Sequence, residues 1–170
     1  TWSKPNFNDS SWASGPGQLG YGDGDENTVL GYGSDPANKH ITTYFRHEFE
    51  VAEPTSFDLL ILRYLVDDGA VFYLNDQEVH RFNMPGDNLS YTTLAISDGY
   101  LDHVVNEARV SAGYLVEGTN ILAVEVHQGY PDSSDLSFEL EMEGTAGTES
   151  LIAANADWKY LDDGTDQGTA

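Results

Sequence analysis

The stretch Leu136-Ser137-Phe138-Glu139-Leu140-Glu141-Met142 alternates strictly between apolar and polar side chains. This two-residue period is typical of a β-strand whose sheet has one buried face and one solvated face. Other runs rich in aromatic and β-branched residues are also expected to be strands. They are residues 44–51, 57–66, 70–74, 78–82 and 120–127. The chain is therefore predicted to be all-β.

Short polar connections predict how some of these strands pair. Asp68-Gly69 and Asn75-Asp76 each separate two strand runs by the spacing that hairpins use. Residues 57–82 are therefore expected to form a three-strand meander, and the more continuously apolar run 121–126 a central strand. Residues 107–116, interrupted at Gly113, are expected to form one or two irregular helical turns.

Composition limits the class of protein. The 170 residues suit one domain, and seven Lys and Arg against 29 Asp and Glu give a net charge of −22. Such a charge repels phosphate backbones and anionic lipids, so neither nucleic acid nor membrane insertion is expected. The carboxylates favour a salty or calcium-rich medium and make Ca²⁺ the expected cofactor. The absence of cysteine excludes disulfides and thiolate sites.

Several motifs are distinctive when taken together. They are Asn-Phe-Asn-Asp-Ser-Ser-Trp at 6–12, the Gly-rich run at 15–26, Thr-Thr-Tyr-Phe-Arg at 42–46, and residues 67–75, 81–85, 118–128 and 133–136. In combination they resemble galactose-binding-like jelly-roll domains, similar to carbohydrate-binding modules, of large secreted bacterial proteins. The resemblance spans about residues 2–143. It implies a jelly-roll β-sandwich body over residues 1–145 and an extracellular or cell-surface location, with any signal peptide outside this sequence.

The order of the segments differs from that family. Family members usually begin with a strand resembling Trp-Lys-Tyr-Leu-Asp-Asp-Gly, which here stands last, at residues 158–164. The expected division is a linker at 146–155, the strand at 156–164 and a polar link at 165–170. The strand either folds back into its own sheet, as in a permuted chain, or completes the sheet of the next copy in a tandem array. In the second case Trp158, Tyr160 and Leu161 form the assembly strand.

Two acidic segments are expected to bind Ca²⁺. Asp23, Asp25 and Glu26 share one Gly-rich loop, although their spacing does not match an EF-hand. Asp67 and Asp68 follow a strand, and Ser133, Ser134 and Asp135 follow another; if both loops lie at one end of the sandwich, they converge on an ion or on ligand hydroxyls. The alternatives are a solvated acidic loop, turn residues and backbone caps. The expected ligands are thus Asp23, Asp25, Glu26, Asp67, Asp68 and Asp135.

Sugar binding requires exposed aromatic faces beside planar polar groups. The candidate residues are Tyr21, Arg46, His127, Gln128 and Tyr130. Alternatives remain open, since Arg46 in a strand often pairs with a carboxylate such as Glu48 or Asp68. Trp12 is expected to be a core anchor.

A hydrolase is not expected. His127, Ser133 and Asp135 supply the residue types of a triad, but the sequence has nothing like a nucleophile elbow. The predicted function is a non-catalytic, calcium-stabilised repeat of a bacterial surface adhesin or filament, joined to neighbouring copies by strand donation. The alternative is a carbohydrate-binding module that directs a secreted enzyme or adhesin to a glycan.

Overall fold

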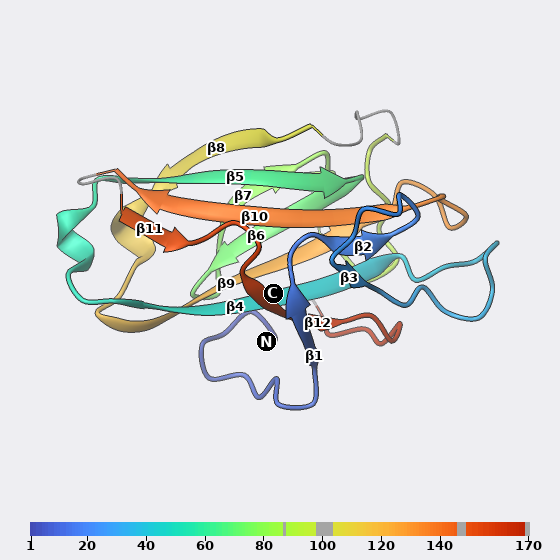
Figure 1. Cartoon of the computed structure of the whole chain (residues 1–170), viewed down its shortest axis with the longest axis horizontal. Helices are drawn as coiled ribbons and strands as arrows, with labels where there is room; N and C mark the ends of the chain where they lie inside the picture. Colours follow the sequence, from blue (N-terminus) through green and yellow to red (C-terminus); the bar gives the residue numbers. More distant parts are fainter. Residues whose placement is uncertain (87, 98–103, 146–148, 169–170) are drawn as a thin grey trace.

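The computed structural model describes residues 1–86, 88–97, 104–145 and 149–168, and within them the chain is a two-layer β-sandwich (Figure 1). The β4 sheet contains, in spatial order, β1 (Ala13–Pro16), β12 (Asp157–Leu161), β4 (Thr42–Val51), β9 (Gly118–His127), β6 (Gly69–Leu74) and β7 (Gln77–Phe82). The β10 sheet contains β3 (Thr28–Val29), β2 (Leu19–Tyr21), β10 (Leu136–Gly144), β5 (Leu59–Asp67) and β8 (Asn106–Ser111), and β11 (Glu149–Ile152) also pairs with β10.

All-β architecture and the six predicted strands are confirmed. In β10 the apolar side chains Leu136, Phe138, Leu140 and Met142 are fully buried, while Glu139 and Glu141 lie on the open face. β9 is central, because it pairs with β4 on one side and with β6 on the other. Helical structure is limited, across the described ranges, to the 3₁₀ turns Pro54–Ser56 and Ala112–Tyr114. Neither turn is long or apolar enough to cross a membrane.

The predicted three-strand meander is wrong. β5 pairs with β10 and β8, whereas β6 pairs with β9 and β7 in the opposite sheet. Only Asp68 separates β5 from β6, so the chain crosses from one sheet to the other there instead of reversing. The second connection is a true hairpin: Asn75 and Asp76 both have positive φ, as a type I′ turn requires.

Two further expectations need correction. Residues 107–111 belong to strand β8, because Ala108 and Val110 are buried while their neighbours are exposed, which is a two-residue period. Only residues 112–114 turn helically. The expected linker at 146–155 contains β11, which pairs with the end of β10; residues 146–148 lie outside the described part of the chain.

The C-terminal strand pairs within this chain. β12 lies between β1 and β4, with Tyr160 opposite Ala13 on one side and Phe45 on the other. Trp158 is 0% exposed, and its ring lies 4.9 Å from that of Phe138 in the core between the sheets. The strand thus completes the sandwich of its own copy.

A second apolar cluster covers the outer face of the β4 sheet. The side chains of Trp2 and Trp12 pack there against Tyr44, with the Trp2 and Tyr44 ring centroids 4.9 Å apart. Trp12 is therefore a core anchor, as expected. Residues 1–12, here called the N-terminal segment, cover Arg46, which is 2% exposed. The Nε atom of Arg46 lies 2.8 Å from Asp9 Oδ2. The N-terminal residues thus form a third layer on one sheet.

Candidate functional site

Two loops far apart in sequence meet at one end of the sandwich. The first is the crossing from β5 to β6, and the second follows β9. Between them lies a pocket of about 260 Å³ lined by Asp67, Asp68, Tyr130, Asp132, Ser133, Ser134 and Asp135. The three carboxylates that the sequence singled out on these two loops, Asp67, Asp68 and Asp135, therefore line one site.

Strand geometry places the deep carboxylates. Asp67 ends β5 opposite Ser137 of β10, and Asp135 precedes the first residue of β10. Asp68 is 2% exposed, and its Oδ2 accepts a hydrogen bond of 2.6 Å from the backbone N–H of Gly129. This bond joins the crossing directly to the loop after β9. The carboxylate of Asp135 accepts a hydrogen bond from Ser134 Oγ.

Lys39 binds the loop that lines the pocket, a role that the sequence did not predict. Its backbone N–H donates to the carbonyl of Pro131 at 2.7 Å. Its buried ammonium group donates to the carbonyls of Ser133 and Ser134 and lies about 5 Å from the ring centroids of Tyr21 and Tyr32. A single lysine in a loop carries no sequence pattern that could have identified this role.

The pocket has a negative electrostatic potential. Burial first, and then the charge of Asp135, raise the pKa of the Tyr21 hydroxyl well above its ordinary value, and Asp67 and Asp68 act in the same direction. The Tyr21 oxygen lies 2.6 Å from Nε2 of Gln128, which also donates to the Asp135 carbonyl at 3.0 Å. Oε1 of this fully buried Gln128 has no hydrogen-bond partner among the described residues. Negative charge and oxygen atoms therefore dominate this end of the molecule.

Such a lining suits hard cations and hydroxyl groups. Ca²⁺ takes six to eight oxygen ligands, and carboxylates, carbonyls and amide oxygens supply them in proteins. No His side chain is among the pocket's lining residues. Tyr130 is 51% exposed, so its ring is available to a ligand at the rim while Asp67 and Asp68 lie deep.

The six predicted metal ligands form two groups. Asp23, Asp25 and Glu26 place one oxygen each within 4.8 Å of one another on the loop after β2. Glu26 accepts hydrogen bonds of 3.0 Å from the N–H groups of Asp23 and Gly24. Backbone hydrogen bonds, the one from its own N–H first, lower the pKa of Glu26. This loop is open to solvent, and none of its carboxylates lines the pocket.

Four of the five predicted sugar contacts are buried in this fold. Tyr21, Arg46, His127 and Gln128 are each at most 5% exposed and bond within the chain. Arg46 pairs with Asp9 instead of Glu48 or Asp68, because the N-terminal segment covers it. Only Tyr130 reaches solvent.

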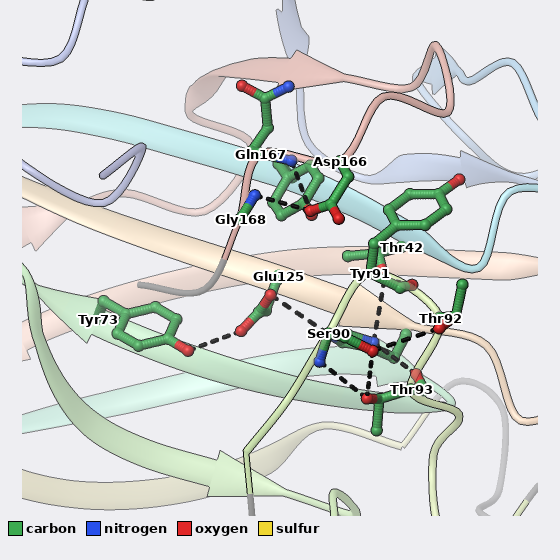
Figure 2. Close-up of polar contacts among 12 residues, drawn as sticks. Thr42, Tyr73, Ser90, Tyr91, Thr92, Thr93, Glu125, Asp166, Gln167 and Gly168 are labelled. Atoms are coloured by element: carbon green, nitrogen blue, oxygen red, sulfur yellow. Dashed lines mark hydrogen bonds and ion pairs between the residues drawn. The ribbon is translucent and has the colours of Figure 1, made fainter.

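His127 belongs to a polar cluster on the outer face of the β4 sheet, which points away from the core between the two sheets. Its Nδ1 lies 2.7 Å from the carbonyl oxygen of Thr93, and its Nε2 lies 3.4 Å from Oε2 of Glu125. Figure 2 shows Glu125 with the Tyr73 hydroxyl, which donates to it at 2.6 Å, and the turn of residues 90–93 nearby. His127 therefore anchors this turn to the sheet and is not an exposed base.

Segments of several solved structures align with this chain. An α-L-rhamnosidase from Aspergillus terreus aligns with 76% of this chain at 18% identity and a TM-score of 0.53, over 15% of its own length. A Streptomyces avermitilis α-L-rhamnosidase complexed with L-rhamnose aligns with 76% at 18% identity and a TM-score of 0.48, over 11% of its length. The PA14 domain of the antifreeze protein MpAFP aligns with 82% at 11% identity and a TM-score of 0.38, over 76% of its length.

These likenesses concern architecture alone. The chain spans only a small part of the rhamnosidases that it matches. No protein-family model and no curated protein matches it. At 18% identity and a TM-score of 0.53, the Aspergillus terreus match shows a similar fold and no function.

Proposed function

We propose that this chain is a non-catalytic, Ca²⁺-stabilised structural module of an extracellular bacterial protein. One observation carries the proposal: Asp67 and Asp68 at the sheet crossing share a pocket with Asp135 of the loop after β9. An ion bound by all three would tie together segments more than 60 residues apart in sequence. The net charge of −22 supports a medium rich in cations, and the resemblance to modules of secreted bacterial proteins supports the location.

Thermal unfolding in Ca²⁺ and in chelator tests the proposal. An ion that binds only the folded state adds about 2.7 kcal/mol at one hundred times its Kd. For a domain of 150–250 residues this corresponds to a rise in Tm of roughly 5–11 °C. Asp68→Asn and Asp135→Asn keep the side-chain shape and remove charge, so the calcium-dependent rise should largely disappear in both.

The matched control is Asp25→Asn, which alters the exposed group after β2 and leaves the pocket intact. Its calcium-dependent rise should equal that of the wild type. A wild-type protein whose Tm is the same in Ca²⁺ and in chelator would refute the proposal. If Asp25→Asn alone abolished the calcium-dependent rise in Tm, the ion would be assigned to the loop after β2 instead of the pocket. Tb³⁺ luminescence excited through tyrosine provides a direct binding readout.

Glycan binding at the same pocket is a second candidate, favoured by the exposed ring of Tyr130. Carboxylates and serine hydroxyls beside an aromatic face suit sugar hydroxyls. Retention on a polysaccharide affinity gel that is lost in Tyr130→Ala, with the Tm unchanged, would support this candidate. A correctly folded protein that no polysaccharide gel or glycan array retains would eliminate it.

A further inference from the structure

β12 occupies an interior position that it could reach from either of its ends. It pairs with β1 on one side and β4 on the other, and it carries Trp158 into the core. Without it, β1 would lose its partner and the core would open at the position of Trp158. The position between β1 and β4, here called the β12 slot, therefore binds one strand tightly.

Upstream, a short turn leads from β11 into β12. The N–H of Ala156 donates to the carbonyl of Ala153 at 3.2 Å, and Asn155 has a φ of 58°. The turn lies at the surface, with Ala153, Ala154 and Asn155 exposed. This turn is the connection that makes the strand part of its own copy.

Downstream, the tail of residues 162–168 leads from β12 to the N-terminal segment. Asp162 is held by the N–H of Gly31 at 2.5 Å and by His40 Nδ1, which lies 2.9 Å from its carbonyl oxygen. At the far end, the N–H of Gln167 donates to the Tyr44 hydroxyl at 3.3 Å. Figure 2 shows Gln167 beside Gly168, whose N–H donates to the side chain of Asp166 at 2.7 Å.

Trp2 packs on the same tyrosine. Its ring centroid lies 4.9 Å from that of Tyr44, so the tail finishes where the N-terminal segment begins (Figure 1). Leu161, the last residue of β12, also packs against the cluster that contains Trp2 and Trp12. The tail thus traces a path from the β12 slot to the first residues of the same fold.

We propose that β12 is an exchangeable strand whose partner is a second copy of this chain. In two copies joined head to tail, the strand and tail of the first copy fit the β12 slot of the second copy by the same path. The contacts with β1, β4 and the core are identical in both arrangements, so only the connections decide which slot is filled. A short link supplies an effective concentration on the order of millimolar for either slot. This inference extends the proposed structural role and does not depend on Ca²⁺.

A tandem fusion tests the exchange. Two complete copies are joined directly, end to start. The second copy carries Trp158→Asp, so that its own β12 no longer fills its β12 slot. In the first copy, a protease site replaces Ala154-Asn155. After cleavage the first strand remains attached only to the second copy, through the tail. It should then occupy the second slot, and size-exclusion chromatography should show the first body released as a separate species.

Two controls make the result decisive. A single copy with the same cleaved site should stay in one piece, because no second slot competes for its strand. A cleaved fusion whose first copy lacks residues 163–167 should also stay together, because its shortened tail can no longer span the path from the β12 slot of the second copy to the start of that copy. If the cleaved full-length fusion stays in one piece, the proposal is overturned.

A permuted chain, with residues 155–170 placed before residues 1–154, provides an independent measurement. It should fold with a Tm within a few degrees of the parent protein, and its failure to fold would also overturn the proposal. Both experiments are performed in chelator and in Ca²⁺. A negative result for calcium binding is thereby separated from a negative result for exchange.

Discussion

Replacement of Trp158 by alanine should remove much of the protein's stability. A buried aromatic side chain removes 150–250 Å² from water, which at about 25 cal/mol per Å² corresponds to roughly 4–6 kcal/mol. Trp→Ala substitutions in protein cores cost about 3–5 kcal/mol. The ring of Trp158 is 0% exposed and contacts Phe138 and His47, so we expect a loss of about 4 kcal/mol.

Urea unfolding measures this loss directly. With an m-value of about 2 kcal/mol/M the midpoint should fall by about 2 M, and the Tm by roughly 8–16 °C. Trp158→Phe, which keeps an aromatic ring, should lose clearly less. Val29→Ala, at a side chain that is 71% exposed, should change the free energy of unfolding by no more than about 0.5 kcal/mol. A loss below about 1 kcal/mol in Trp158→Ala would refute the assignment of β12 to the core.

Arg46→Met should loosen the N-terminal layer, because the guanidinium group donates to Asp9 and to the carbonyls of Trp2 and Lys4. Asp9 is partly exposed, so the loss should not exceed the roughly 3 kcal/mol that removing one partner of a buried pair costs. Hydrogen exchange should rise first in residues 1–12, and uniform exchange across the chain would contradict this. Burial lowers the pKa of His47, so the native state favours its neutral form, and the stability that this provides is present above about pH 6.5 and lost as the pH falls below that value. His47→Gln should therefore flatten the decline in urea midpoint between pH 7 and pH 5, and an unchanged slope would disprove the effect of burial.

Local patterns were sufficient to predict the long strands, but not the short strands β1, β2, β3 and β11, not β8, and not the sheet to which each strand belongs. The alternation in residues 136–142 reports burial on one face, and that depends only on neighbouring residues. The partner of β6 depends on a segment about 50 residues away, since Val71 lies opposite Glu125. Asp-Asp-Gly is good turn chemistry in either case, so the sequence could not distinguish a hairpin at Asp68 from a crossing between sheets.

The candidate site was predictable to a similar extent. Asp67, Asp68 and Asp135 stand out as acidic residues at strand ends. The sequence predicted that they would meet if their two loops lay at the same end of the sandwich. Burial of Arg46 and His127 could not be foreseen, because polar residues on alternate strand positions suggest a wet face. Here that face is covered by the N-terminal segment and by the turn at residues 90–93, whose contacts with the sheet leave no periodic pattern.

The meeting of the two ends of the chain at Tyr44 has a mechanical consequence. Tension applied through Trp2 and Gln167 would act on two points that contact one side chain, so the load would not run along either sheet. The tail and the N-terminal segment would yield first, and β12 would follow, while the strands around β9 and β10 carried little force. Modules connected in this way would lengthen in small steps by local opening, and their cores would remain folded.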